Sequence, residues 1–267
     1  MNTNNKRTTI RNALITAGAG GIGREIARRL KSDGYRVFIT DIDTAAGARV
    51  RDELGVEFIK CDSGVYDEMR AAVAQVGEME VLVNNVGIRG GTGALWKIPI
   101  DDFRKTIDVN AISHIFMAQL VAPGMIERRS GVIIMIASGA ARTGTIGRAP
   151  YGISKWALLG LTKSLANELA PWGIRANAVL PGIVSGERFD GSMTLHAEEE
   201  GITREQALED HVPHATEALH RSFRDRRSCC LSCVRRRYRH HWHLPRCQWR
   251  VRIAQSFRAR HRSASQA

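Results

Sequence analysis

The stretch Thr16-Ala17-Gly18-Ala19-Gly20-Gly21-Ile22-Gly23 decides the fold of this 267-residue chain. It follows a short apolar run, Asn12 to Thr16, that is typical of a buried strand, and it precedes a helical pattern from Glu25 to Leu30. Glycines allow a tight turn and a close approach of the backbone to a ligand, and the N-terminus of a helix favours an anion. The strand, the turn and the helix together predict a cradle for a phosphate group.

The next predicted strand, Tyr35 to Thr40, ends at an acid, Asp41. A carboxylate about 20 residues after the glycines can bind a ribose 2′-hydroxyl and repel a 2′-phosphate. The alternative is that Asp41 only caps a loop. The glycine-rich turn before it favours the ribose role, so we expect NAD as the cofactor rather than NADP.

Strand-like and helix-like segments alternate along the rest of the chain. The predicted strands are Val56–Cys61, Val81–Val83, Gly131–Ala137 and Ile174–Leu180, and the predicted helices are Thr44–Leu54, Tyr66–Val76, Ile100–Arg128 and Tyr151–Ala170. This alternation predicts an α/β fold, a Rossmann-like doubly wound parallel sheet flanked by helices. In such sheets a ligand lies beyond the carboxyl ends of the strands, where Asp41, Asp62 and Asn85 fall.

Tyr151 and Lys155 lie four positions apart on one predicted helix, so they share a face. An ammonium group beside a tyrosine lowers the phenol pKa and makes proton transfer to a carbonyl or alcohol easier. The pair alone is a weak signal, because most such pairs lie on solvated helix faces. Ser138 ends the fifth predicted strand, and Asn110 lies among apolar residues where its amide needs partners. His114, on the same helix as Asn110, is interpreted as a packed residue without a role.

Several ordered motifs resemble the short-chain dehydrogenase/reductase family over Arg11 to Val184. They are T-A-G-A-G-G-I-G at 16–23, N-N-V-G at 84–87, Asn110, Ser138, Y-G-I-S-K at 151–155 and P-G-I-V at 181–184. Two positions depart from the family pattern. Ala17 replaces a glycine, which is tolerable if its φ is negative, and Val86 replaces an alanine and adds bulk near the cofactor ribose.

The resemblance implies a dehydrogenase or reductase that interconverts a small alcohol and ketone with NAD, without a metal. It implies that Tyr151 is the general acid/base, Ser138 orients the substrate oxygen, Lys155 binds the nicotinamide ribose and lowers the tyrosine pKa, and Asn110 holds a water of the proton relay. The implied cofactor-binding residues are Ala17, Ala19, Gly20, Gly21, Ile22, Gly23, Asp41, Asp62, Ser63, Asn85, Val86, Gly87, Tyr151, Lys155, Pro181, Gly182, Ile183 and Val184. It further implies a homodimer or homotetramer.

Substrate choice is expected in the loops after Gly87, around Ala140–Pro150 and after Val184. Four arginines lie in or near these loops and either bind an anionic substrate or are solvated: Arg89, Arg142, Arg148 and Arg188. Residues 185–214 resemble a mobile substrate lid. The polar start of the chain indicates no signal peptide, and no apolar stretch is expected to span a membrane, so we expect a cytoplasmic protein.

The composition divides the chain into a catalytic domain at 8–214 and an unusual tail at 215–267. Residues 221–267 carry 14 arginines against one acid, Asp225, so they account for the net charge of +12, and the residues before them sum to −1. Overall basicity is therefore no signal for nucleic-acid binding by the domain.

Three interpretations of the tail compete. It is a basic arm that binds nucleic acid, a zinc site of Cys230, Cys233, His243 and Cys247, or a frameshifted version of an ordinary ending. Read one base later, Trp242 and Trp249 must both become glycine, and His240 to Arg250 permits I-T-G-I-S-L-D-V-N-G, which resembles the closing strand of the family. Ala218 to Arg239 permits a sequence that resembles its penultimate helix.

The frameshift interpretation is favoured, with a disordered tail, and nucleic-acid binding is not expected. An arginine-rich ending cannot bury the same apolar face, so we predict a chain that encodes the site but is poorly stable or inactive. The alternative function is a catalytically impaired nucleotide-binding protein whose tail binds nucleic acid or a partner.

Overall fold

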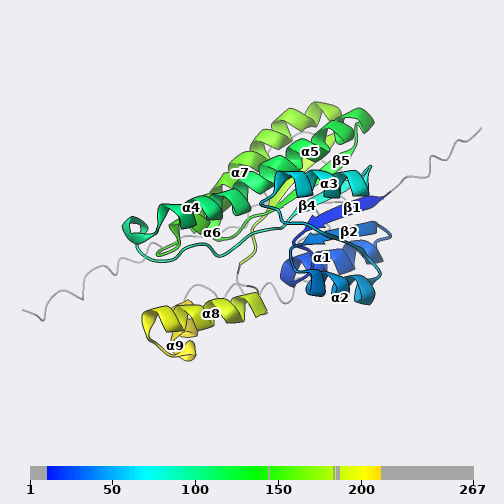
Figure 1. Ribbon diagram of the computed structural model, residues 1–267. Coiled ribbons are helices and arrows are strands. Elements are labelled where there is room, and N and C mark those ends of the chain that lie inside the picture. Colours follow the sequence, from blue (N-terminus) through cyan, green and yellow to red (C-terminus); the bar gives the residue numbers. More distant parts are fainter. Residues whose placement is uncertain (1–10, 144, 183, 185–186, 212–267) are drawn as a thin grey trace, which may run out of the picture. The chain divides into compact units, whose positions relative to one another are not determined.

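The computed structural model describes residues 11–143, 145–182, 184 and 187–211, and its centre is one parallel sheet (Figure 1). The six strands run in the order β3-β2-β1-β4-β5-β6. Their bounds are β1 Asn12–Thr16, β2 Arg36–Asp41, β3 Glu57–Lys60, β4 Val81–Asn84, β5 Gly131–Ile136 and β6 Ile174–Val179. The strand order reverses between β1 and β4, the position at which doubly wound sheets bind ligands. The predicted fold class is confirmed.

Helices connect successive strands, as right-handed crossovers between parallel strands require. They are α1 Gly21–Ser32, α2 Thr44–Leu54, α3 Tyr66–Val76, α4 Ile100–Ile107, α5 Ser113–Arg128, α6 Ala140–Thr143 and α7 Ala149–Leu169, followed after β6 by α8 Glu187–Glu200 and α9 Arg204–His211. Short helical turns lie at Leu95–Lys97, Asp108–Ile112 and Ala170–Trp172.

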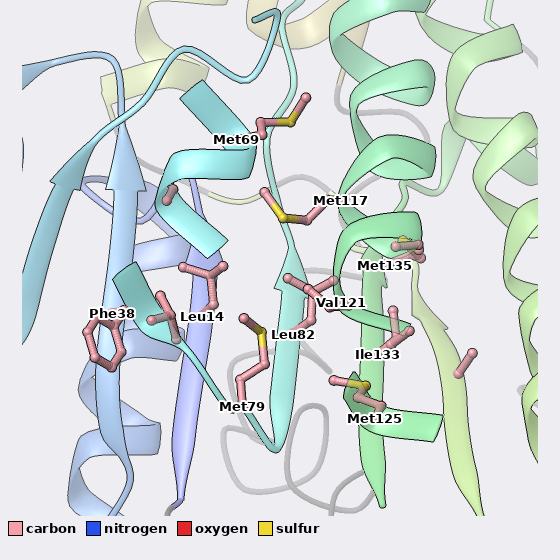
Figure 2. Packing of buried hydrophobic residues seen from close by; sticks show 14 of the residues in the cluster. Leu14, Phe38, Met69, Met79, Leu82, Met117, Val121, Met125, Ile133 and Met135 are labelled. Carbon is pink, nitrogen blue, oxygen red and sulfur yellow. The ribbon is translucent and has the colours of Figure 1, made fainter. Parts of the chain in front are cut away.

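The strands alternate their side chains between two cores, because successive residues of a strand point to opposite faces. On one face Leu14, Leu82 and Ile133 pack with methionines from β5, from the loop before β4, from α3 and from α5 (Figure 2). On the other face Ile15, Val83 and their neighbours pack against Ile26, Ala27 and Leu30 of α1 and Val50 of α2. The sheet is therefore covered by α1 and α2 on one side and by α3, α5 and α7 on the other (Figure 1).

The predicted boundaries hold closely where the hydrophobic period is regular. Strand β1 and helices α2 and α3 begin and end at the predicted residues. The predicted helix Ile100–Arg128 is interrupted by a π-helical turn at Asp108–Ile112, and α6 was not predicted. An extra residue in a helical turn often marks a functional position, and here the turn carries Asn110.

The same stretch corrects one expectation. By length and composition Ile100–Arg128 is apolar enough to cross a membrane, contrary to the expectation that no such stretch exists. Its apolarity has another physical reason, because Met117, Ala118, Val121 and Met125 are buried in the core against the sheet. Long apolar core helices of this kind pass the same test as membrane spans.

The tail at 215–267 and its zinc-site candidates, Cys230, Cys233, His243 and Cys247, lie outside the described residues. The division at 214 and the frameshift therefore stay predictions.

Candidate active site

The glycine-rich turn is tied to the end of β4 by two polar side chains. Thr16 Oγ1 accepts hydrogen bonds from the backbone N–H of Asn85 at 2.9 Å and of Val86 at 3.1 Å. Asn85 Nδ2 donates in return to the carbonyls of Thr16 and Ala17 at 3.1 and 2.9 Å. The predicted N-N-V-G motif therefore holds the turn beside the point where the strand order reverses.

The glycines of the turn have two different roles, close packing within the protein and space for a ligand. A Cβ at Gly18 would lie 2.6 Å from Cβ of Ile39, and one at Gly23 would lie 2.7 Å from Nδ2 of Asn85. These two glycines allow close packing within the protein. At Gly20 and Gly21 an added Cβ would meet nothing within 4 Å. The open space there, beside the N-terminus of α1, fits a pyrophosphate bound by backbone N–H groups.

Ala17 does not meet the condition under which its replacement of glycine was expected to be tolerated. Its φ is +49°, in the left-handed region that side chains with a Cβ disfavour. Ala17 and Arg129 are the non-glycine residues with positive φ in the described part of the chain. The turn keeps the glycine conformation at residue 17, and the alanine there is strained.

Asp41 lies at the glycine-rich turn, as the spacing predicts. Its Oδ2 accepts a hydrogen bond from the N–H of Ala19 at 3.0 Å, and its Oδ1 accepts one from Asp43 at 3.1 Å. The second bond is the loop-capping contact of the alternative interpretation. The half-buried carboxylate thus both caps the loop and contacts the turn that would hold the cofactor.

The next strand end carries Asp62 and Ser63. Asp62 Oδ1 accepts from the N–H of Gly64 at 2.8 Å, and its own N–H donates to Glu68 Oε2 at 2.8 Å. Asp62 is half-buried and Ser63 is buried. The loop is fixed at the edge of the sheet where a base next to the ribose would lie.

Asn110 holds the segment that follows β4. Its Oδ1 accepts from the N–H of Ile88 at 2.7 Å, and its Nδ2 donates to the carbonyl of Ile88 at 3.0 Å. The same Nδ2 donates to Ser154 Oγ at 3.1 Å, and Ser154 donates to the carbonyl of Tyr151 at 2.7 Å. The fully buried amide thereby joins the Val86–Ile88 segment to the helix that carries the tyrosine.

Lys155 meets Asn110 at Gly87. A Cβ built on Gly87 would lie 3.2 Å from Asn110 Oδ1 and 3.3 Å from Lys155 Nζ. Lys155 is buried, its Nζ donates to the carbonyl of Ile136 at 2.9 Å, and it lies 5.9 Å from the centroid of the Tyr151 ring. Lys155 therefore faces the protein interior at the end of the sheet, and Tyr151, on the same helix, is half-buried.

Ser138 lies two residues beyond the carbonyl that Lys155 binds. Its Oγ accepts from the N–H of Ala140 at 3.2 Å, which begins α6. The N–H of Gly139 donates to the carbonyl of Pro181 at 2.9 Å, so the predicted P-G-I-V segment starts beside Ser138. Pro181 is half-buried, Gly182 and Val184 are exposed, and Ile183 lies outside the described residues.

Arg148 contacts the tyrosine from the substrate loop. Its guanidinium carbon lies 4.5 Å from the Tyr151 ring centroid, and the side chain is half-buried. The N–H of Gly93 donates to the carbonyl of Gly147 at 2.9 Å, which joins the loop after β4 to this loop. Arg89 is also half-buried, whereas Arg142 is exposed. The side chain of Arg188 is not among the described ones.

His114 was given no role from the sequence, yet it contacts the same segment as Asn110. Its Nε2 lies 2.9 Å from the carbonyl oxygen of Val86. Complete burial, with a smaller effect of the Lys155 charge, lowers the pKa of His114 to about 3, so the imidazole is neutral. A histidine four residues after Asn110 on an apolar helix is the one sequence signal for this contact.

The turn, the acid after β2 and the tyrosine–lysine–serine set define a class, the oxidoreductases that bind a nicotinamide dinucleotide on a doubly wound sheet. Residues 11–194 match the short chain dehydrogenase family. The chain belongs to this short-chain dehydrogenase/reductase family, whose members bind NAD or NADP and act on CH–OH groups.

Characterised relatives span several substrates. The chain is 34% identical over 202 residues to human dehydrogenase/reductase SDR family member 4, covering 72% of each chain. A crystal structure of an actinorhodin polyketide ketoreductase variant with NADPH has a TM-score of 0.69 at 33% identity, covering 74% of this chain and 79% of that one. An NAD⁺-bound xylitol dehydrogenase has a TM-score of 0.65 at 31% identity, covering 72% and 78%.

Proposed function

We propose that this chain is an NAD(H)-dependent enzyme that interconverts a small organic alcohol and its ketone. The observation that carries the proposal is that Lys155 Nζ and Asn110 Oδ1 both lie beside Gly87. Lys155 shares its helix face with Tyr151, so these groups and the tyrosine belong to one site. A cofactor held from the glycine-rich turn would run past Gly87 towards these groups.

The proposed binding roles follow the sheet edge. Gly20 to Gly23 would bind the pyrophosphate, Asp41 the adenosine ribose, and Asp62 and Ser63 the adenine. Asn85, Val86, Gly87 and Lys155 would hold the nicotinamide ribose, and Pro181 to Val184 would line the nicotinamide. Asp41 favours NAD, because its carboxylate would repel a 2′-phosphate beside Ala19.

When bound, the nicotinamide supplies or accepts the hydride. Tyr151 would donate a proton to the carbonyl oxygen during reduction and take it back during oxidation, with Ser138 orienting that oxygen by a hydrogen bond. Lys155 would stabilise the phenolate by its charge, and Asn110 would hold a water of the proton relay. The site needs no metal for these steps.

Two arginines lie in the loops proposed to choose the substrate: Arg148 lies over the Tyr151 ring, and Arg89 is on the adjoining loop. A ketone with a carboxylate beside the carbonyl would therefore bind better than its neutral counterpart. A panel that pairs each neutral ketone with the matching 2-oxo acid tests this preference directly.

We further propose a cytoplasmic enzyme that assembles as a homodimer or homotetramer.

The test of the function is Tyr151→Phe, made in the chain whose residues 218–250 carry the sequence read one base later, with two readouts, NADH binding and ketone-dependent NADH oxidation. We expect turnover to fall by a factor of about 10² or more while NADH binding is retained, since the proton donor is removed and the glycine-rich turn, Asp41 and Lys155 stay in place. A chain that binds no NADH, or a variant that keeps its turnover, contradicts the proposal.

The same assay tests the expectation for the tail. It compares the chain as written with one whose residues 218–250 carry the sequence read one base later. We expect turnover in the second chain and little in the first. Ordinary turnover by the chain as written would leave the proposed function standing and would make the prediction of an impaired chain wrong.

A further inference from the structure

His114 is a buried polar residue whose contact lies on the cofactor side of the fold. It is fully buried in α5, and its Nε2 is 2.9 Å from the carbonyl oxygen of Val86. A carbonyl oxygen only accepts hydrogen bonds, so the neutral ring must carry its proton on Nε2. The bond therefore runs from His114 to the backbone of the segment after β4.

The segment is held at two points by one helical face. Asn110 bonds both the N–H and the carbonyl of Ile88, and His114 bonds the carbonyl of Val86. Between them lies Gly87, the residue at which Lys155 and Asn110 converge. Val86 and Gly87 share a peptide bond, so a shift of Val86 would also move Gly87 relative to Lys155.

The histidine is a poor choice for stability alone. Its Nδ1 is buried and accepts no hydrogen bond from the described part of the chain. A buried acceptor without a partner costs at least as much free energy as one hydrogen bond contributes. A leucine would fill a similar apolar volume without a buried Nδ1 but would leave the Val86 carbonyl without this donor, so the Val86 contact is the feature that the histidine adds.

We propose that His114 is a positioning residue for the nicotinamide cofactor, and that its bond to Val86 fixes the Val86–Ile88 main chain against which the nicotinamide ribose lies. This inference rests on the proposed function, since it needs a cofactor at Gly87. His114 acts through the backbone and touches neither the cofactor nor the substrate.

The experiment measures NADH affinity by fluorescence titration of the full chain, and the midpoint of urea unfolding in parallel, for three variants. His114→Leu removes the bond, and His114→Gln keeps a donor at nearly the same distance from the backbone. Ser113→Ala is the matched control, because Ser113 is buried on the same turn and its Oγ donates to Val109, away from the segment.

We expect His114→Leu to weaken NADH binding about tenfold, the loss of one hydrogen bond, with little change in the unfolding midpoint. That variant exchanges one buried acceptor without a partner, Nδ1, for another, the Val86 carbonyl. His114→Gln should restore NADH affinity to within about twofold. Ser113→Ala should lower the unfolding midpoint and leave NADH affinity unchanged.

Two results overturn the inference. One is a His114→Leu chain that binds NADH as the wild type does, which would make the role structural. The other is a His114→Gln chain as weak as His114→Leu, which would separate affinity from the hydrogen bond. A wild-type chain that binds no NADH contradicts the proposed function itself and removes the inference with it.

Discussion

The proposed nucleotide-binding half of the site and the proposed catalytic half, called by these names below, are built from different groups of the protein. Around the glycine-rich turn the protein supplies backbone N–H groups and open space at Gly20 and Gly21. Around Gly87 it supplies three buried side chains that bond to the backbone, Asn110, Ser154 and Lys155, and the first two also bond to each other. Substitutions that add atoms should therefore disturb the first half most, and substitutions that remove side-chain atoms should disturb the second half most.

Gly23→Ala should show the largest effect in the nucleotide-binding half. Its new methyl group would clash with the backbone of Ala17 and Gly18, which cannot withdraw easily, and with Asn85 Nδ2, which is held by its bonds to the carbonyls of Thr16 and Ala17. We expect a loss of about 3 kcal/mol in the free energy of unfolding, measured with urea.

Gly20→Ala is the matched control for this clash. Its φ of −155° suits any residue, and nothing lies within 4 Å of the added carbon. Stability should change by less than about 0.5 kcal/mol. NADH affinity should still fall, because the methyl group occupies the space for the pyrophosphate. Equal destabilisation by Gly23→Ala and Gly20→Ala would contradict the assignment of packing to Gly23 and of ligand space to Gly20.

Asn110→Ala tests the catalytic half by removal. It leaves the N–H and carbonyl of Ile88 and the hydroxyl of Ser154 without the amide. Since unpaired buried groups keep their desolvation cost, we expect a loss of about 2 to 3 kcal/mol. Ser154→Ala removes one of these contacts and should lose less. If calorimetry ranks Ser154→Ala as the more damaging change, the amide does not hold this half together.

A pH dependence of stability should follow from His114. Its pKa is lowered to about 3 in the folded protein against about 6.5 when unfolded, so the unfolded chain binds the extra proton first. Stability is then unaffected by this group above pH 6.5 and is lost as the pH falls towards 3. Between pH 7 and pH 5 the loss should be about 2 kcal/mol.

His114→Gln isolates this contribution from that of the other histidines. Urea unfolding at pH 7 and pH 5 should show a smaller loss for the variant than for the wild type, by about 2 kcal/mol. Parallel pH profiles for the two chains would mean that His114 is charged, or reaches water, in the folded protein.

Apart from the control Gly20→Ala, Ala17→Gly should change stability least, and in the favourable direction. Glycine relieves the strain of φ +49°, and its greater freedom in the unfolded chain offsets part of the gain, leaving about 1 kcal/mol. Ala19→Gly, two residues on and without positive φ, should instead lower stability. A melting temperature of Ala17→Gly below that of the wild type would contradict the strain assigned to Ala17.

The arrangement of strand, turn, helix and acid in the nucleotide-binding half could be predicted because its signal is local. Glycine spacing, the strand before it and the acid at Asp41 lie within 30 residues, and each follows from backbone geometry. The strain at Ala17 could not be predicted, since it depends on the turn keeping its glycine conformation without a glycine. That outcome is set by the bonds from Asn85, which is distant in sequence.

The catalytic half could be predicted by residue type but not by contact. Tyr151, Lys155 and Ser138 were found from motifs, whereas the partners of Asn110 and His114 were not. Those partners come from segments 22 to 44 residues away, joined by the packing of α5 and α7 beside β4. The π-helical turn that carries Asn110 could not be predicted either, because the spacing of apolar residues there does not differ from that of an ordinary helix.

The central claim is that one nicotinamide cofactor lies across both halves, from Asp41 to Lys155. The most direct test is a titration of the full chain with NADH and with NADPH under the same conditions. We predict that NADH binds at least about tenfold more tightly, because Asp41 would meet the extra phosphate. Tighter binding of NADPH, or binding of neither cofactor, would contradict the account.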